Sequence, residues 1–193
     1  MLEKHEDGFY GLLIEVLMQH AAPVHDKMVK ELVALRKRKG RLFCLGVGGG
    51  AANAAHAVND FRKLCGIEAY APTDGISELT ARANDEGWGT VFLEWLRVSN
   101  FSTTDALFVF SVGGGQVDVS ACIYQAVVRA KEIGALVLGV VGLPTGATAI
   151  LGDVVVVTHV IGDLRTPITE AAQVAVLHAL VSDPRLQLAP TKW

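Results

Sequence analysis

Four nearly continuous runs of apolar residues mark the chain after its first forty positions, at residues 42–47, 106–112, 135–141 and 154–159. Such runs are typical of strands that are buried on both faces, as in a parallel sheet covered by helices on either side. A weaker strand candidate lies at residues 68–71. The pattern therefore predicts four strands and a fifth, shorter one.

The segments between these runs are long enough for crossover helices, which we expect at residues 51–64, 89–100 and 117–133. Strands that alternate with helices in this way favour an α/β fold with a parallel, doubly wound sheet. In such sheets, ligands bind beyond the carboxyl ends of the strands. The loops at these strand ends are therefore the first place to look for function.

Two helices are predicted before the first strand, at residues 9–22 and 24–39, because apolar residues recur there at helical spacing. Pro23 stands at the junction of the two helices, and Gly40 ends the second.

The last helix is predicted at residues 168–181. Thr166 is its expected N-cap, and Pro167 its expected first helical residue. This helix follows the last strand, so its start should lie near the sheet edge that carries the ligand.

Composition and charge narrow the classes of partner. The formal charge is −3, and no basic cluster exceeds RKRK at residues 36–39, so no nucleic-acid partner is expected. The apolar runs are too short to cross a bilayer, and the first residues, MLEKHEDG, are charged where a signal peptide would be apolar. We therefore expect no membrane partner and a cytoplasmic location. Cys44, Cys65 and Cys122 match no CxxC pattern, which favours buried thiols over disulfides.

Glycine-rich turns follow two of the predicted strands, GVGGG at residues 46–50 and SVGGGQVD at residues 111–118. A strand, a glycine turn and a helix start leave backbone N–H groups at the positive end of a helix dipole, where anions bind. The spacing matches neither GxGxxG nor a P-loop. The two turns predict two walls of one anion pocket, while the alternative that they only permit tight turns stays open.

His56 and Asp60 lie four residues apart in the predicted helix at 51–64, so they share one helix face. This spacing is compatible with a surface ion pair as well as with part of a site. His178 follows apolar residues and is equally compatible with a core histidine, and Glu170 with a carboxylate that complements a helix dipole. On a straight helix, Glu170 and His178 are about 12 Å apart along the axis.

Four motifs, in order from about Glu15 to Leu180, resemble those of the sugar isomerase (SIS) domain family, and within it the phosphoheptose isomerases. GVGGGAANAAHAVNDF resembles their GNGGSxxDAxHFxxEL, and ANDEGW at 83–88 resembles their xNDxGF. SVGGGQVDV resembles their STSGNSxNV, and RTPITEAAQVAVLH at 165–178 resembles their RTPRIQExHxxxxH.

The resemblance implies one SIS domain over residues 1–193 with a five-stranded parallel sheet between helices. It divides the chain into N-terminal oligomerisation helices at 1–40, an α/β core at 41–181 and a tail at 182–193. It further implies a homotetramer whose active sites lie between subunits.

The resemblance also implies a divalent metal ion, often zinc, held at the positions of His56, Asp60, Glu170 and His178. Asp60 is one methylene shorter than the family's glutamate, and Glu170 replaces its glutamine. The set remains competent for zinc, because it offers two imidazoles and two carboxylates. Asp60 or Glu170 is the expected catalytic base and His178 the expected acid.

The implied substrate pocket departs further from the family pattern. Gly50, Val112, Gly113 and Gln116 replace hydroxyl residues that bind phosphate in the family, while Ser111 is retained. The ligand is therefore a phosphosugar, a nucleotide sugar or a sugar without phosphate at the usual place. The residues expected at the substrate are Gly48, Gly49, Gly50, Asn53, Asp85, Ser111, Gly113, Gly114, Gly115, Gln116 and Thr166.

The sequence thus predicts an aldose–ketose isomerase that acts on a sugar phosphate through an enediol, as phosphoheptose isomerases do on sedoheptulose 7-phosphate. The alternative is a non-catalytic SIS module that binds a phosphosugar, a nucleotide sugar or a protein partner. The altered glycine turns favour this alternative, and the metal set favours the enzyme.

Overall fold

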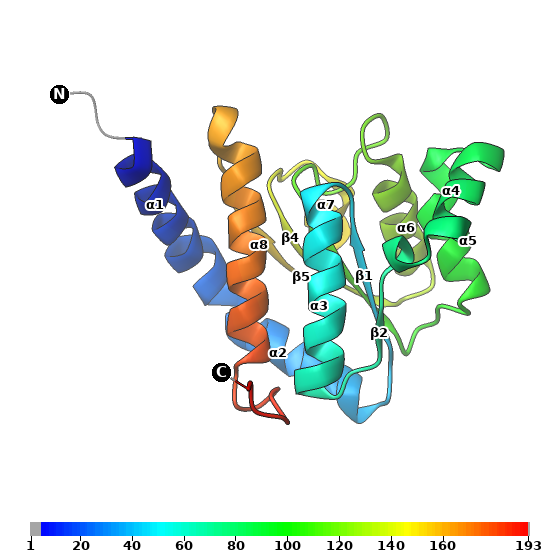
Figure 1. Cartoon of the computed structure of the whole chain (residues 1–193), viewed down its shortest axis with the longest axis horizontal. Helices are drawn as coiled ribbons and strands as arrows, with labels where there is room; N and C mark the ends of the chain where they lie inside the picture. Colours follow the sequence, from blue (N-terminus) through cyan, green and yellow to red (C-terminus); the bar gives the residue numbers. More distant parts are fainter. Residues whose placement is uncertain (1–4, 193) are drawn as a thin grey trace.

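The computed structural model describes residues 5–192 and contains one parallel sheet of five strands in the order β2-β1-β3-β4-β5 (Figure 1). All four neighbouring pairs are parallel. This confirms the predicted α/β fold. The strands are β1 (Leu42–Gly46), β2 (Ala69–Tyr70), β3 (Ala106–Ser111), β4 (Leu136–Val141) and β5 (Val154–Val157).

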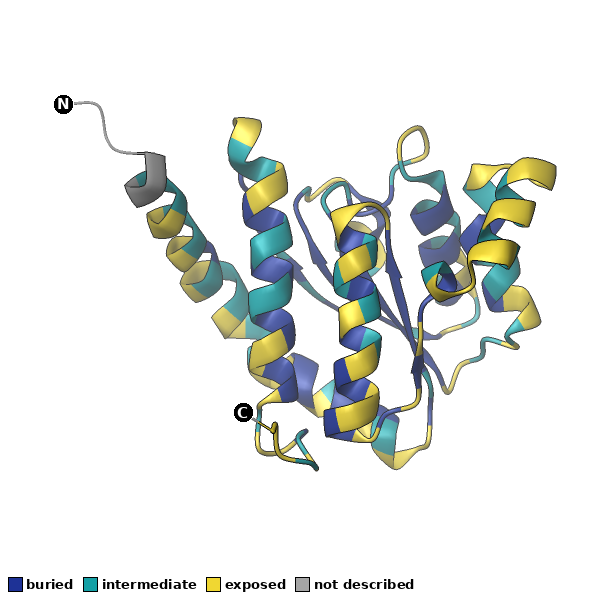
Figure 2. Cartoon of the chain, in the orientation of Figure 1, coloured by how far each residue is buried: buried dark blue, intermediate teal, exposed yellow. Residues whose placement is uncertain are grey.

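Helices cover both faces of the sheet, so β1 and β3 are buried along their whole length (Figure 2). One core cluster joins the sheet to α2 (Ala22–Lys37), α3 (Gly49–Cys65) and α8 (Arg165–Val181). The other joins it to α5 (Val91–Val98), α6 (Ala121–Glu132) and α7 (Ala147–Leu151). Within residues 5–192, no helix has the length and apolar character needed to span a membrane.

The N-terminal segment is one kinked helical run and not two helices with a break at Pro23. Helix α1 (His5–Val16) continues through a π-helical turn, η1 (Leu17–Ala21), directly into α2. Proline lacks an N–H group and crowds the preceding turn, and a wider π turn accommodates both effects. Residues 1–4 of the charged N-terminal segment and Trp193 of the predicted tail lie outside the described residues.

Two further predictions at the carboxyl edge were wrong in detail. A 3₁₀ turn, η4 (Gly162–Leu164), leads straight into α8, so the helix begins at Arg165 and Thr166 lies inside its first turn instead of capping it. The apolar pattern also did not predict helix α4 (Ile76–Asp85), and Asp85, which was expected at the substrate, is the last residue of this helix. The three cysteines are free and buried, as expected.

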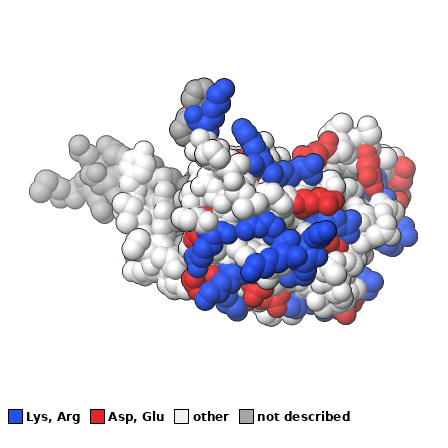
Figure 3. Space-filling view, turned by 90° about the horizontal axis from the view of Figure 1, so that it is seen from below, with Lys and Arg blue, Asp and Glu red and all other residues white. Residues whose placement is uncertain are grey.

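Basic side chains gather on the face seen from below in Figure 3. Several helices carry Lys or Arg in their last turn, where a positive charge complements the negative end of the helix dipole. These residues are Arg36 and Lys37 of α2, Arg62 and Lys63 of α3, Arg97 of α5, and Arg129 and Lys131 of α6. The fold itself therefore accounts for this basic face.

Candidate active site between helices α3 and α8

Helices α3 and α8 lie side by side and run in the same direction (Figure 1). They meet at three levels, where Glu170 faces Gly49, Asn53 faces Gln173, and His178 faces His56. The parallel arrangement follows from the topology, because each helix starts after a strand end at the carboxyl edge of the sheet. The seam therefore leads from the first glycine turn to the histidines.

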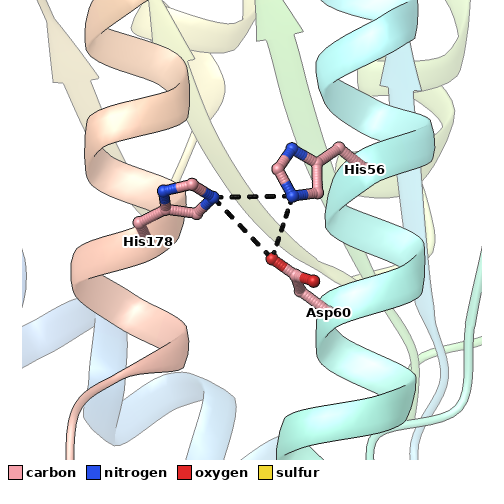
Figure 4. A group of neighbouring side chains, drawn as sticks. All are labelled: His56, Asp60 and His178. Atoms are coloured by element: carbon pink, nitrogen blue, oxygen red, sulfur yellow. Dashed lines mark hydrogen bonds and ion pairs between the residues drawn. The ribbon is translucent and has the colours of Figure 1, made fainter. Parts of the chain in front are cut away.

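His56, Asp60 and His178 form a compact cluster on this seam (Figure 4). The Nε2 atom of His56 lies 3.2 Å from Oδ2 of Asp60 and 3.5 Å from Nε2 of His178, and the latter two atoms are 4.0 Å apart. Asn59 donates a hydrogen bond to the other oxygen of Asp60 at 2.9 Å. The Asp60 side chain is 12% exposed, whereas both imidazoles reach the surface.

The spacing of these three donor atoms fits a zinc ion. Ligands about 2.1 Å from a tetrahedral ion lie about 3.4 Å from one another, near the 3.2, 3.5 and 4.0 Å separations in the cluster. Two imidazoles and one carboxylate leave a fourth position open, which is the pattern of catalytic rather than structural zinc sites.

The structure does not bring Glu170 to this cluster. A Cβ atom built on Gly49 would lie 2.5 Å from Oε2 and 2.6 Å from Oε1 of Glu170, so the carboxylate rests against Gly49 at the start of α3. The separation follows from the eight residues, about 12 Å of helix rise, between Glu170 and His178. Glu170 and the histidines therefore occupy opposite ends of the seam.

Asn53 turns toward α8. Its side-chain amide donates to Oε1 of Gln173 at 2.8 Å and to the backbone oxygen of Glu170 at 3.2 Å. Gln173 is fully buried and donates to the backbone oxygen of Val140 at 3.1 Å. This chain of amides fixes α8 against both α3 and β4. Gln173 was not predicted, and its one signal is a lone polar residue within the apolar AAQVAVL segment.

The first glycine turn is tightly packed. Gly48 has a φ of 61°, which favours glycine, and a Cβ atom on Gly50 would lie 2.2 Å from the backbone oxygen of Phe110. A serine at position 50 therefore has no room, because α3 approaches β3 too closely. This contact is the physical reason for glycine at this position.

The second glycine turn has a different construction. The hydroxyl of Ser111 accepts a hydrogen bond from the N–H of Gly114, and Gly114 and Gly115 have φ values of 70° and 83°. Among the described residues, no hydrogen bond uses the N–H groups of Gly113, Gly115 or Gln116. These three groups are available to an anion.

The two glycine turns were predicted to form two walls of one anion pocket, but the groove found at the second turn has no wall from the first. A groove of about 490 Å³ lies beside the second turn, lined by Gly115, Gln116 and residues of α6 and α7, and no residue of the first turn lines it. The side-chain amide of Gln116 donates a hydrogen bond to the hydroxyl of Thr145 at 3.2 Å across this groove. The sequence did not single out Thr145. Asp85 accepts a hydrogen bond from its neighbour Asn84, and both are exposed.

Comparison with known proteins gives several relatives, among them phosphoheptose isomerases. No protein-family model matches the chain. The lincomycin biosynthesis protein LmbN of Streptomyces lincolnensis is 34% identical over 73% of this chain, which spans only 54% of LmbN. A phosphoheptose isomerase of Mycobacterium tuberculosis is 32% identical over 72% of this chain and 68% of its own length.

Solved structures agree on the fold. The phosphoheptose isomerase GmhA of Neisseria gonorrhoeae superposes with a TM-score of 0.79, at 24% identity, over 92% of both chains. The mycobacterial match decides the family, and the shared sheet agrees with it. The chain belongs to the sugar isomerase (SIS) domain family, in its phosphoheptose isomerase branch.

Proposed function

We propose that the chain is an aldose–ketose isomerase that acts on a sugar phosphate. The observation that carries this proposal is the cluster of His56, Asp60 and His178, in which a largely buried carboxylate and two accessible imidazoles lie within 4.0 Å of one another. Proton transfer between neighbouring carbons needs such a base and acid, held together and open to the ligand.

Asp60 acts as the base, because it is the carboxylate that lies beside His178, whereas Glu170 lies at Gly49. Asp60 takes the proton from C2 of the open-chain aldose, and protonated His178 gives a proton to the carbonyl oxygen at C1, which leaves an enediol. His178 then takes the proton from the hydroxyl at C2, and Asp60 returns its proton to C1. The product is the ketose.

Alternatively, His56, Asp60 and His178 would hold a divalent ion, for which zinc is our choice; because an ion at Nε2 of His178 would occupy the place of the acidic proton, it would take over the role of that proton at the carbonyl oxygen. When bound, the ion would supply Lewis-acid stabilisation of the negative charge that develops on the sugar oxygens. Asn59 holds Asp60 in place through its hydrogen bond to the second carboxylate oxygen. Ser111, the N–H groups of residues 113, 115 and 116, and the amide of Gln116 would hold the phosphoryl group.

The site would be completed by a second copy of the chain in a homotetramer. Both imidazoles are exposed on the outer side of the α3–α8 seam, and the exposed fraction of the His178 side chain is 56%. A neighbouring subunit over this seam would exclude water from the reaction.

The test is deuterium exchange in deuterated water, followed by proton NMR, at C2 of a panel of aldose phosphates and at C1 of the matching ketose phosphates. The wild type should exchange the C2 proton of at least one sugar. Asp60→Asn should lower the rate by at least about a hundredfold, because it removes the base and keeps the shape. His25→Gln is the matched control: it removes an imidazole that pairs with Asp183 outside the cluster, and it should leave the rate unchanged.

Absence of exchange with every sugar would favour the second candidate, a non-catalytic SIS module that binds a sugar. The loss of hydroxyl side chains from both glycine turns supports this alternative. Metal content separates the two: one bound divalent ion per chain, lost in His56→Gln, supports the enzyme.

A further inference from the structure

The start of helix α3 contains a negative charge that comes from another helix. The first turn of α3 has no acidic residue of its own, and among the described residues no hydrogen bond uses the N–H groups of Gly49 and Gly50. Glu170 of α8 supplies the charge, because its carboxylate contacts Gly49 at the place where a side chain would otherwise stand. The position of this carboxylate thus depends on glycine at 49.

A carboxylate at this place changes what the turn attracts. The positive end of a helix dipole favours one negative group, and Glu170 already provides it. A phosphate at the same turn would lie within a few ångströms of this carboxylate, and like charges at that distance repel. In the family motif that the chain resembles, the residue at this position is an uncharged glutamine.

The neighbouring contacts also disfavour phosphate at this turn. Gly50 is pressed against the backbone oxygen of Phe110, so no hydroxyl side chain can be added there to hold phosphate. Residue Glu170 is half-buried, and no hydrogen bond to another described residue uses either of its carboxylate oxygens. Both oxygens are free to accept hydrogen bonds, which sugar hydroxyls donate and a phosphate dianion does not.

We infer that Glu170 is a specificity-determining residue that closes the glycine turn of α3 to phosphate and reserves it for an uncharged, hydroxyl-bearing part of the sugar. This inference rests on the proposed function, since it assumes that the seam binds a sugar. The two glycine turns then differ in the groups that they bind: the turn of α3 binds uncharged groups, and any phosphoryl group binds at residues 113–116.

Calorimetric titration with inorganic phosphate tests the inference. Glu170→Gln removes the charge and nearly keeps the shape, so it should bind phosphate at least about tenfold more tightly than the wild type. Glu170→Asp keeps the charge and should bind phosphate as weakly as the wild type. Glu132→Gln removes the same charge from the far end of α6, where Glu132 pairs with Arg129, and should also match the wild type.

A second titration compares fructose with fructose 6-phosphate, and thermal unfolding verifies that every variant is folded. The ratio of the two affinities should shift toward the phosphate ester in Glu170→Gln alone. Equal phosphate affinity in the wild type and Glu170→Gln, or an equal gain in Glu132→Gln, overturns the inference. Either result leaves the proposed function standing, because deuterium exchange at C2 tests that function separately.

Discussion

Gly50 and Gly113 replace hydroxyl residues of the family motif, and they differ in the room that each leaves for a side chain. A Cβ atom on Gly50 would overlap the backbone oxygen of Phe110, whereas nothing lies within 4 Å of one on Gly113. Gly113 also has no positive φ. The loss of the first hydroxyl therefore reflects packing, and the loss of the second leaves open space.

Restoring serine at each position should give opposite results. Gly113→Ser should bind a sugar phosphate about threefold to tenfold more tightly, the gain of one hydrogen bond, with little change in stability. Gly50→Ser should lower the free energy of unfolding by about 1–3 kcal/mol, since the overlap is with backbone. Calorimetry and urea unfolding measure the two effects. A stable Gly50→Ser protein would contradict the packing argument.

Strands β1 and β3, which carry the two glycine turns, are joined at their amino ends by Arg41 and Asp105. Asp105 is 1% exposed and accepts hydrogen bonds from the backbone and guanidinium of Arg41 and from Ser102. Burial opposes ionisation of this carboxyl, but these bonds outweigh it, so the pKa of Asp105 is lowered. The ion pair thereby fixes how the two strands, and hence their turns, stand beside each other.

The lowered pKa gives a stability prediction with a definite sign. A carboxyl whose pKa is lower in the folded state stabilises the fold above its unfolded pKa, near 4, and this stabilisation is lost as the pH falls through the folded pKa. Asp105→Asn should cost about 2–4 kcal/mol at pH 7, and this difference should shrink below pH 4. Urea unfolding at pH 7 and pH 3 measures it. Glu94→Gln breaks an exposed pair and should cost less than about 1 kcal/mol at either pH.

The elements differ in how far the sequence predicts them. Continuous apolar runs located all four strong strands to within two residues, because burial on both faces leaves no other pattern. The short helices α4 and α7 and the unbroken passage through Pro23 depend on tertiary contacts, which local patterns do not contain.

At the site, the spacing of His56 and Asp60 predicts their pairing, and helix rise predicts the distance from Glu170 to His178. The contact of Glu170 with Gly49 and the role of Gln173 depend on how α8 packs, and this is not visible in either segment alone.

At the scale of the whole molecule, helix α1 lies at one side of the protein beside α8 (Figures 1 and 2). Together with η1, it carries apolar residues on two faces. One face, with Leu12, Leu13 and Val16, packs against Ile168 and Ala172 of α8. The other face is a stripe of exposed residues at helical spacing: Tyr10, Ile14 and Met18 are each more than 60% exposed. An apolar groove of about 520 Å³ lies close by, between η1, α2 and α8. Exposed apolar surface of this extent is typical of a protein interface.

The resemblance to phosphoheptose isomerases implies a homotetramer, so we expect light scattering at micromolar concentration to give four times the mass of the chain. Ile14→Glu places a charge in the stripe and should shift the protein to smaller species, because an unpaired charge in an apolar interface is costly. The deuterium exchange rate of Ile14→Glu should also fall, because the histidines of the seam would lose the neighbouring subunit that shields them. Val98→Glu is the matched control, since Val98 is half exposed at the end of α5, away from the stripe, and it should keep both mass and rate. A monomeric wild type, or an Ile14→Glu monomer with full activity, would show that each chain forms its site alone.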